Sequence, residues 1–397
     1  MRLMAPDPGR KFLMDPYLEW CKGEGIPIVE DFGIDILAVE TRRWDRYDAK
    51  GAFIHVKGRG DFASVYALDI PPGSRTSPQR HLFEELVYVL EGQGSTIVEA
   101  PDGSRHTFEW AAKSLFALPL NCRYQHFNGM GRQRALLACS HDLPITMNLI
   151  HDEAFIFDNP YVFKERFGDV KYYSGEGDFI PVRVGRHMWE TNFIADLTNF
   201  ELKTWNERGK GSAHMSFVLA DGTMHAHVSE IPTARYKKAH RHLPGFHIFA
   251  ITGTGYTLLW YENEQEFRKV PWRHGTMYAP PLAMFHQHFN DCPRPARYLA
   301  IGLGSRRYPF SVERAEGIDM GSDTSLKEGG IQIECEDQDP RIHAMWLKAI
   351  ADNGVASDMG EIIDESLYTT ESVERPVSAQ KAGGPQRSAA AKTVVRQ

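Results

Sequence analysis

The sequence predicts an all-β protein made of two tandem antiparallel barrels, with short helical extensions at its N- and C-terminal ends. Two blocks, residues 51–150 and 212–305, consist of short runs of β-forming residues separated by turn residues, without a helical pattern between the strands. The two blocks also share residue motifs at matching offsets. Duplication of one small barrel accounts for both observations.

Length and composition are those of an ordinary globular protein. The chain has 397 residues, 42% of them hydrophobic and 24% charged, which is enough for two or three domains with their own cores. Its net charge of −7 provides no basic surface for nucleic acid or anionic membranes. No apolar run approaches the roughly 20 residues that span a bilayer, and the first residues lack the apolar core of a secretory signal. We therefore expect a cytoplasmic protein with neither nucleic-acid nor membrane partners.

The cysteines form no recognisable pattern. All five are scattered and none belongs to a CxxC pair, which argues against a disulfide framework and against a thiolate zinc site. We expect each to be a buried free thiol. They are Cys21, Cys122, Cys139, Cys292 and Cys335.

Residues 1–50 are predicted to form an N-terminal arm with one short helix. Asp15 followed by Pro16 is a typical helix start, and Gly23 follows the helical stretch over residues 17–22. We expect the arm to pack on a barrel, where such segments cover an edge strand or contact a neighbouring subunit.

The strands of the two barrels are predicted from β-rich runs bounded by turns. A connecting region, residues 151–211, separates the blocks and has turn clusters but no clean periodicity. In the first block the predicted strands cover residues 52–56, 63–68, 85–90, 115–118 and 134–138. In the second block they cover residues 216–219, 246–251, 256–260 and 297–301.

The blocks match position by position in two motifs. The first motif of the first block contains Gly73, Gln79, His81, Glu85 and Gly92, and that of the second block contains Ala234, His240, His242, Phe246 and Gly253. In the second motif Lys113, Pro119, Asn121, Tyr124 and Asn128 keep the offsets of Gly275, Pro281, Ala283, His286 and Asn290. Agreement over two motifs of this length is not expected by chance.

The C-terminal extension, residues 306–375, is predicted to contain one helix over residues 341–351. Asp339 and Pro340 start this helix, and Gly354 lies just past its end. Its apolar residues fall on one face, which is typical of a docking surface. Residues 376–397 have no core-forming apolar pattern, and we expect a disordered tail.

Three histidines of the second block have the arrangement of metal ligands. His240 and His242 are two residues apart on a predicted strand, so their side chains point to the same face. His286, in the second motif of the same block, can complete a set of three. Three neutral nitrogen donors leave the rest of a divalent ion's coordination sphere open, as catalysis at a metal requires. We expect this to be the working site.

Both motifs resemble those of the cupin superfamily, G-x5-H-x-H-x3-4-E-x6-G followed by G-x5-P-x-G-x2-H-x3-N, over residues 50–305. With two copies the chain resembles a bicupin, which implies two jelly-roll barrels with a metal position in each mouth. In the second copy the ligand positions hold His240, His242, Phe246 and His286, and in the first copy Gln79, His81, Glu85 and Tyr124. Because the first copy keeps only two good ligands, we expect it to be a structural partner.

Phe246 stands where the motif has a glutamate, and this has a chemical consequence. Three neutral imidazoles leave the full +2 charge of the ion, which favours anionic, chelating substrates. The second copy thereby resembles thiol dioxygenases and the ring-cleaving bicupins typified by gentisate 1,2-dioxygenase, which implies Fe(II), or alternatively Mn, Ni, Co or Zn, in a homodimer or larger homo-oligomer. In the gentisate group the ligand set lies in the first barrel, whereas here it lies in the second.

Three further residues are candidates for catalytic roles. His288 has the strand parity of His286, so it could face the cavity as a proton shuttle, and Gln287 lies between the two. Arg241 could bind a substrate carboxylate if its side chain turns inward. Each has an ordinary alternative, as a hydrogen-bonded barrel residue or a solvated surface residue.

Other histidines of the second block are expected to be structural. His225 and His227 form another H-x-H pair, but no second motif follows them at the required spacing. His247 directly follows Phe246, so on a regular strand it points away from the other ligands.

The sequence favours an Fe(II)-dependent dioxygenase that acts with O2 on a small, anionic and aromatic compound. Two alternatives remain open. One is an isomerase, lyase or hydrolase in which the metal is a Lewis acid, and the other is a non-catalytic bicupin that binds its ligand through the metal. Activity without oxygen would favour the first alternative, and metal-dependent binding without turnover the second.

Overall fold

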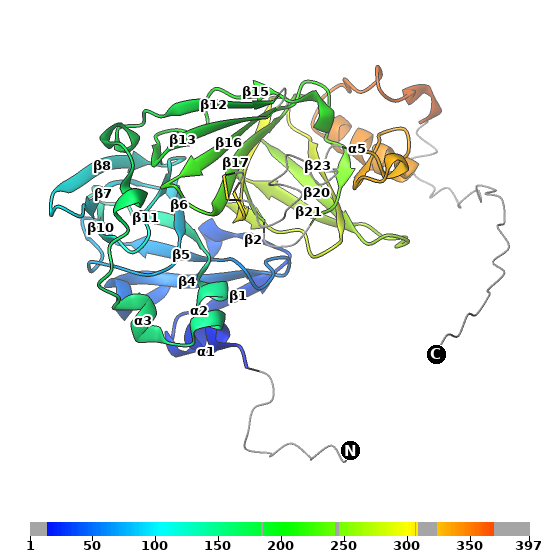
Figure 1. The fold of residues 1–397 in the computed structure, drawn as a ribbon. Coiled ribbons are helices and arrows are strands. Elements are labelled where there is room, and N and C mark those ends of the chain that lie inside the picture. The colour runs from blue at the N-terminus through cyan, green and yellow to red at the C-terminus, as the bar shows by residue number, and fades with distance from the viewer. Residues whose placement is uncertain (1–13, 184–185, 243–245, 306, 309–323, 369–397) are drawn as a thin grey trace, which may run out of the picture.

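The computed structural model describes residues 14–183, 186–242, 246–305, 307–308 and 324–368. Within these residues the strands form four sheets, a large and a small one in each barrel. In Figure 1 the first barrel (blue to cyan) lies beside the second (green to yellow), and helix α5 lies on the side of the second barrel that is away from the first. The chain folds as two tandem antiparallel jelly-roll barrels, with short helices before and after them.

The first barrel has the strand order β1-β4-β5-β11-β6-β9-β14 in its large sheet, with β3 paired to β4, and β10-β7-β8 in its small sheet. Strands far apart in the sequence are neighbours, which is the connectivity of a jelly roll. The bounds are β1 Ile28–Asp31, β3 Arg42–Trp44, β4 Ala49–Val56, β5 Ser64–Ile70, β6 Glu85–Glu91, β7 Gln93–Glu99, β8 Arg105–Ala111, β9 Leu115–Ala117, β10 Arg123–Asn128, β11 Ala135–His141 and β14 Phe193–Ile194.

The second barrel repeats this arrangement. Its large sheet has the order β12-β13-β16-β17-β24-β19-β22-β2, with β15 paired to β16, and its small sheet has the order β21-β20-β23-β18-β25. The bounds are β2 Gly33–Asp35, β12 Asp178–Arg183, β13 Arg186–Thr191, β15 Lys203–Thr204, β16 Ala213–Leu219, β17 Met224–Ile231, β18 Ala239–His240, β19 His247–Thr252, β20 Thr254–Trp260, β21 Arg268–Arg273, β22 Thr276–Tyr278, β23 Phe285–Asn290, β24 Ala296–Leu303 and β25 Gln332–Ile333.

The two helices expected from capping residues are present, and both are capped as the sequence predicts. Asp15 accepts a hydrogen bond from the Leu18 amide at the start of α1 Pro16–Gly23, and Asp339 accepts one from the Arg341 amide at the start of α5 Pro340–Asp352. The other helices are α2 Leu143–Ile150, α3 Glu153–Phe157 and the short 3-10 helices Ile36–Ala38, Asp45–Tyr47, Lys164–Phe167, Val170–Tyr173, Asn206–Arg208, Leu326–Glu328 and Glu365–Leu367. No described helix is long and apolar enough to cross a membrane.

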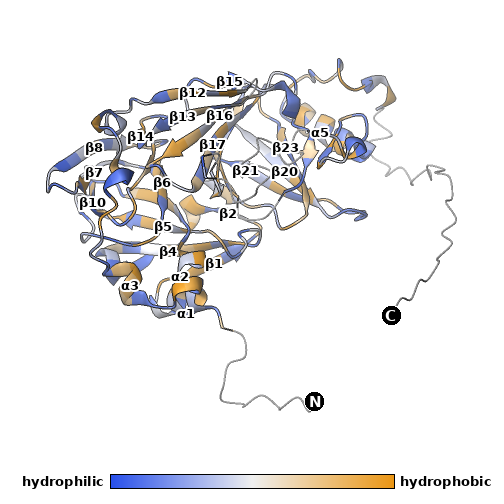
Figure 2. Ribbon diagram, viewed as in Figure 1, coloured by the Kyte–Doolittle hydropathy of each residue, from blue (hydrophilic) through white to orange (hydrophobic). Residues whose placement is uncertain are grey.

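Buried hydrophobic side chains fill both barrels and the space between them. Figure 2 shows hydrophobic residues along the strands of both barrels. Phe53 and Val87 belong to the core of the first barrel, and Ile248 and Val270 to that of the second. A further cluster packs the large sheets against each other, and the apolar face of α5 packs on the outside of the small sheet of the second barrel. All five cysteines are buried free thiols, as expected.

The duplication is visible in the pairing of equivalent residues. Gln79 is bridged to Tyr124 in the first barrel, and His240 pairs with His286 at the same place in the second. Asn128 donates from Nδ2 to the carbonyls of Ile70, Pro71 and Gln133, while Asn290 donates to those of Ile231, Pro232 and Arg294. The shared motif residues therefore perform the same structural task twice.

Segments outside the two repeats join the barrels together. β2, from the N-terminal arm, pairs with β22 of the second barrel, and β14, from the connecting region, pairs with β9 of the first. The connecting region, expected to lack regular structure, thus contributes strands to both barrels. The predicted disordered tail, residues 376–397, lies outside the described residues, as does part of the C-terminal extension.

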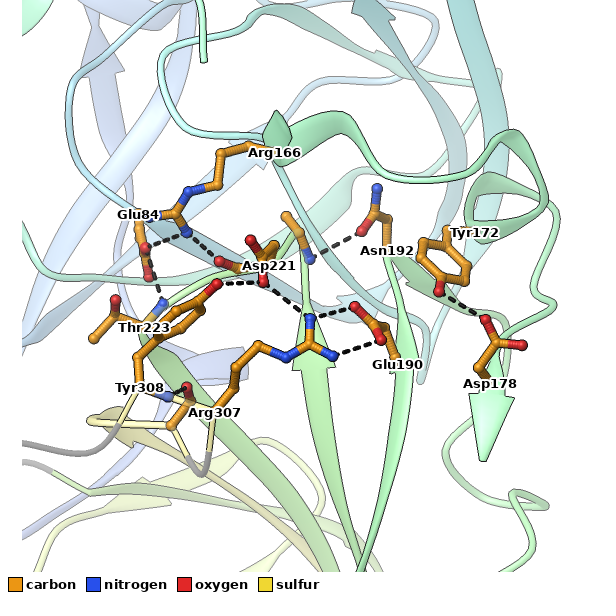
Figure 3. A network of polar contacts seen from close by, with 12 residues as sticks. Glu84, Arg166, Tyr172, Asp178, Glu190, Asn192, Asp221, Thr223, Arg307 and Tyr308 are labelled. Carbon is orange, nitrogen blue, oxygen red and sulfur yellow. Dashed lines mark hydrogen bonds and ion pairs between the residues drawn. The ribbon is translucent and has the colours of Figure 1, made fainter. Parts of the chain in front are cut away.

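A polar network ties the connecting region to both barrels (Figure 3). The Arg166 guanidinium donates to the Glu84 carboxylate at 3.0 Å and to the carbonyl of Asp221. Glu84 also accepts hydrogen bonds from the backbone amides of Thr223 and Met224 at 2.9 and 2.7 Å. One carboxylate of the first barrel is thereby bonded to a turn of the second.

Candidate metal centre

Three histidines of the second barrel converge on one point, as the sequence predicts. His240 in β18 and His286 in β23 are directly opposite each other in an antiparallel pair, so their side chains lie on the same face. The ring centroids are 4.0 Å apart for His240 and His286, 4.7 Å for His242 and His286, and 5.6 Å for His240 and His242. One ligand nitrogen from each ring lies within 4.8 Å of the others. We call these three residues the histidine trio.

His240 and His286 are neutral, which is the protonation state that coordinates a metal ion. Burial, followed by nearby positive groups, lowers the pKa of His240 and of His286 well below the usual value, so both rings are neutral. His286 is 1% exposed, and neither of its ring nitrogens has a hydrogen-bond partner. A buried imidazole without partners is costly, and coordination to a metal would satisfy it.

An aromatic ring stands at the fourth ligand position. The Phe246 ring centroid is 5.1 Å from that of His242, so the place of the motif's glutamate is next to the trio but apolar. With three neutral donors and no carboxylate, a divalent ion here would keep its full charge. The donor set fits Fe(II), and also Mn, Co, Ni or Zn, since all accept imidazole ligands.

His288 lies beside the trio in a defined orientation. Its ring centroid is 5.3 Å from that of His286, and its Nδ1 is 2.9 Å from Thr257 Oγ1 and 3.0 Å from the Tyr278 hydroxyl. Thr257 donates to the Tyr278 oxygen, which leaves the Tyr278 proton for His288 Nδ1. Burial, and then the charge of Lys237, lowers the pKa of His288 well below the usual value. The neutral ring then carries its proton on Nε2, available as a donor.

Two buried basic side chains lie near the trio. Lys237 is 1% exposed, and its Nζ is 3.2 Å from the hydroxyl of Tyr298, whose ring centroid is 5.0 Å from that of His288. Arg208, 7% exposed, follows burial as a cause of the lowered pKa of His240. Neither residue is marked by a pattern in the sequence, because Arg208 lies in the aperiodic connecting region and Lys237 resembles a surface residue.

The side chains of Gln287 and Arg241 point away from the trio. The Gln287 amide donates to the Lys237 carbonyl at 2.9 Å and to Gln338 Oε1 at 3.0 Å, on the opposite face of β23 from His286. The Arg241 guanidinium pairs with Glu262 at 2.8 Å and covers the outward-facing ring of Phe285. Strand alternation explains both placements, since neighbours of inward-facing residues face outward.

The other histidines of the second barrel take different positions. His225 and His227 lie on β17 with 2.8 Å between Nε2 of the first and Nδ1 of the second, and their rings approach that of Phe246. They are therefore separated from the trio by one aromatic side chain. His247 is fully buried, and burial, followed by the charge of Arg59, lowers its pKa to about 3.

In the first barrel the corresponding positions bond to each other and to the backbone. His81 accepts at Nε2 from the Tyr124 hydroxyl at 2.9 Å, and its Nδ1 donates to the Phe83 carbonyl at 2.9 Å. Tyr66 donates to Glu85, and Gln79 turns away to the Arg46 carbonyl. Burial raises the pKa of Glu85 to about 7. In the described part of the chain, only the trio has the spacing of a metal site with three such ligands.

Comparison with known proteins finds similarity to solved structures only. A mutant of Bacillus subtilis oxalate decarboxylase matches with a TM-score of 0.46 and 14% identity, covering 70% of this chain and 78% of that chain. The Lactobacillus farciminis oxalate decarboxylase formate complex matches with a TM-score of 0.46 and 12% identity, covering 74% of this chain and 92% of that chain. No protein-family profile and no curated protein matches the sequence.

Proposed function

We propose that this protein is an Fe(II)-dependent dioxygenase that acts with O2 on a small, anionic and aromatic compound. The observation that carries the proposal is the convergence of His240, His242 and His286, with both nitrogens of His286 buried and unpartnered. When bound, iron would supply a redox-active Lewis acid with open coordination positions. The same three nitrogens would suit manganese, cobalt, nickel or zinc, so the choice of iron is part of the proposal.

The residues around the trio suit an anionic substrate. Arg208 and Lys237 are basic side chains buried near the trio, where electrostatic interactions are stronger than in water. His288 presents Nε2–H beside the trio and can donate a hydrogen bond to a substrate oxygen. Tyr278 and Thr257 hold its ring in place through Nδ1. Apolar neighbours such as Phe246 limit water at the reacting centre.

Metal content tests the site itself. We expect protein purified without chelator to contain one metal equivalent per chain, and the variant His286→Ala to lose it, as measured by elemental analysis. Tyr124→Phe, which changes the equivalent position of the first barrel, is the matched control and should retain the metal. Equal metal content in wild type and His286→Ala would refute the trio as the binding site.

Oxygen consumption tests the reaction. Protein reconstituted anaerobically with Fe(II) should take up O2 when one of a panel of hydroxybenzoates and thiols is added. No uptake with any of them, in protein shown to be loaded with iron, would contradict the dioxygenase proposal. Turnover that persists without oxygen, or with zinc in place of iron, would instead support the isomerase, lyase or hydrolase alternative.

A further inference from the structure

A cavity of about 720 Å³ has two chain or strand neighbours of His286 in its wall. Leu259 in its wall is the direct strand partner of His286, so the two side chains lie on the same face of the small sheet. Met284, also in the wall, precedes His286 by two residues and shares its side of the strand. The wall of the cavity therefore includes two buried neighbours of His286, of which Leu259 is 0% and Met284 5% exposed.

The cavity joins three parts of the chain. Phe32 comes from the N-terminal arm and packs against the core of the second barrel. Lys57 directly follows β4 of the first barrel, and Arg268 begins β21 of the second. The remaining wall comes mainly from the hairpin between β20 and β21, residues 261–267. A volume of this size is typical of a site for a small molecule.

Two cations at one ring are the unusual feature of this cavity. The Arg268 guanidinium carbon is 4.0 Å from the centroid of the Phe32 ring, and Lys57 Nζ is 5.1 Å from it. Neither side chain forms an ion pair with any residue that the structure describes, whereas Arg273 on the same strand pairs with Asp35 at 3.0 Å. Like charges held at one ring repel each other, and an anion bound between them would remove that repulsion.

The acidic residues in the wall of the cavity form no ion pair with Lys57 or Arg268. Glu264 and Glu266 also belong to its wall, but both lie in the hairpin. Glu264 accepts a hydrogen bond from the Tyr261 amide at 2.8 Å within the same turn. The cavity thus combines a basic side formed by Lys57 and Arg268 with an apolar part of its wall.

We propose that Lys57 and Arg268 form an anion-binding entrance that holds the carboxylate of an organic acid while its apolar body lies in the cavity. A guanidinium can hold a carboxylate through two parallel hydrogen bonds, and an ammonium adds a third donor. The role of this entrance in catalysis rests on the proposed function. Anion binding at the entrance can be measured without turnover.

Binding of benzoate, compared with that of the uncharged isostere benzamide, tests the entrance. Titration calorimetry on metal-loaded protein should show benzoate affinity falling about tenfold in Arg268→Gln and further in the double variant with Lys57→Gln. Benzamide affinity should stay unchanged. Lys269→Gln is the matched control, because Lys269 neighbours Arg268 on β21 but covers Tyr256 and does not line the cavity. The wild-type preference for benzoate should also weaken with added salt.

Two results would overturn the entrance. One is equal benzoate affinity in wild type and the double variant, and the other is no preference of the wild type for benzoate over benzamide. Repeating the titrations in His286→Ala separates capture at Lys57 and Arg268 from coordination to the metal, and the charge variants should keep their effect there. If iron-loaded protein consumes no oxygen but benzoate binding still depends on the two cations, the dioxygenase proposal fails and the entrance stands.

Discussion

His288 and its counterpart in the first barrel, His126, are held in the same way. Thr257 Oγ1 lies 2.9 Å from Nδ1 of His288, and Thr96 Oγ1 lies 2.8 Å from Nδ1 of His126. The threonine and histidine pair is thus part of the duplicated fold, and Tyr278 is what the second barrel adds. Lys237, Tyr278 and Tyr298 of the second barrel stand where the first has Thr76, Phe116 and Leu137.

Replacing Phe246 tests the electrostatic account of the trio. In Phe246→Glu a carboxylate would enter beside His242, adding a negatively charged fourth ligand position. We expect the variant to retain metal longer than the wild type during dialysis against a chelator, and to bind anionic substrates more weakly. Metal analysis over the course of dialysis measures the first effect.

The neutral variant Phe246→Gln is the control for this change. It introduces a polar side chain of the same length without the charge, so it should not slow metal loss to the same extent. Identical metal retention in the glutamate and glutamine variants would contradict the assignment of residue 246 to the ligand shell.

Glu85 in the first barrel should make stability depend on pH. Burial raises its pKa to about 7 in the folded protein, against about 4.3 in an unfolded chain. The folded state therefore binds the proton more tightly, and stability falls as pH rises from about 4.3 to about 7, by an amount on the order of 3 kcal/mol. We expect Glu85→Gln to remove this loss.

Urea unfolding between pH 4.5 and pH 8 measures the effect. The stability of Glu85→Gln relative to the wild type should rise with pH and level off above about pH 7. Taking the difference removes contributions shared by both proteins, such as that of His55, whose pKa is lowered to about 3 by burial. Glu109→Gln, at an exposed position of β8, should show a flat difference. A flat difference for Glu85→Gln as well would refute the prediction.

At the scale of elements, one asparagine anchors the same strand in each barrel. Asn128 ends β10 and Asn290 ends β23, and each donates to three backbone carbonyls. Replacement by alanine leaves buried carbonyls without donors, so each variant should lose about 3 kcal/mol of unfolding free energy. Only Asn290→Ala should also weaken metal binding, because β23 carries His286. Urea unfolding with metal analysis of both variants checks this, and metal loss in Asn128→Ala would contradict it.

The sequence predicts those elements whose determinants are local. Turn residues delimit the nine strands predicted in the two repeats, and Asp15 and Asp339 start helices that begin one residue from their predicted positions. Within the repeats the sequence did not indicate β7, β8, β10, β21 and β22. The strands β12 to β15 were missed, because they are fixed by pairing with strands such as β9 and β16 rather than by a pattern of their own. The helix α2, within the predicted first barrel, was also missed.

The distinction between local and tertiary determinants also applies to the metal site. Strand alternation and motif spacing are local, and they identify His240, His242 and His286. Arg208 and Lys237 reach the site only through tertiary burial, which leaves no pattern in the sequence around them. The cavity of Lys57 and Arg268 is made by three distant segments, so no local signal could have indicated it.

At the scale of the whole molecule, the two barrels are joined by more than a linker. β2 and β14 each complete a sheet with a strand from another part of the chain, and the apolar cluster between the large sheets contains residues of both barrels. Glu84 of the first barrel is bonded to a turn of the second (Figure 3). Separate unfolding of one barrel would break all of these contacts.

Metal binding in the second barrel should therefore stabilise the first. A ligand that binds only the folded state adds about 2.7 kcal/mol at a concentration 100 times its dissociation constant. If the barrels unfold together, hydrogen exchange measured with and without metal should show equal gains in protection for the slowest amides of β5 and β11 and for those of β20 and β23. His286→Ala should show no gain in either barrel. A gain in protection confined to the second barrel would contradict this prediction. It would mean that β2, β14 and the apolar cluster between the large sheets do not make the two barrels unfold together.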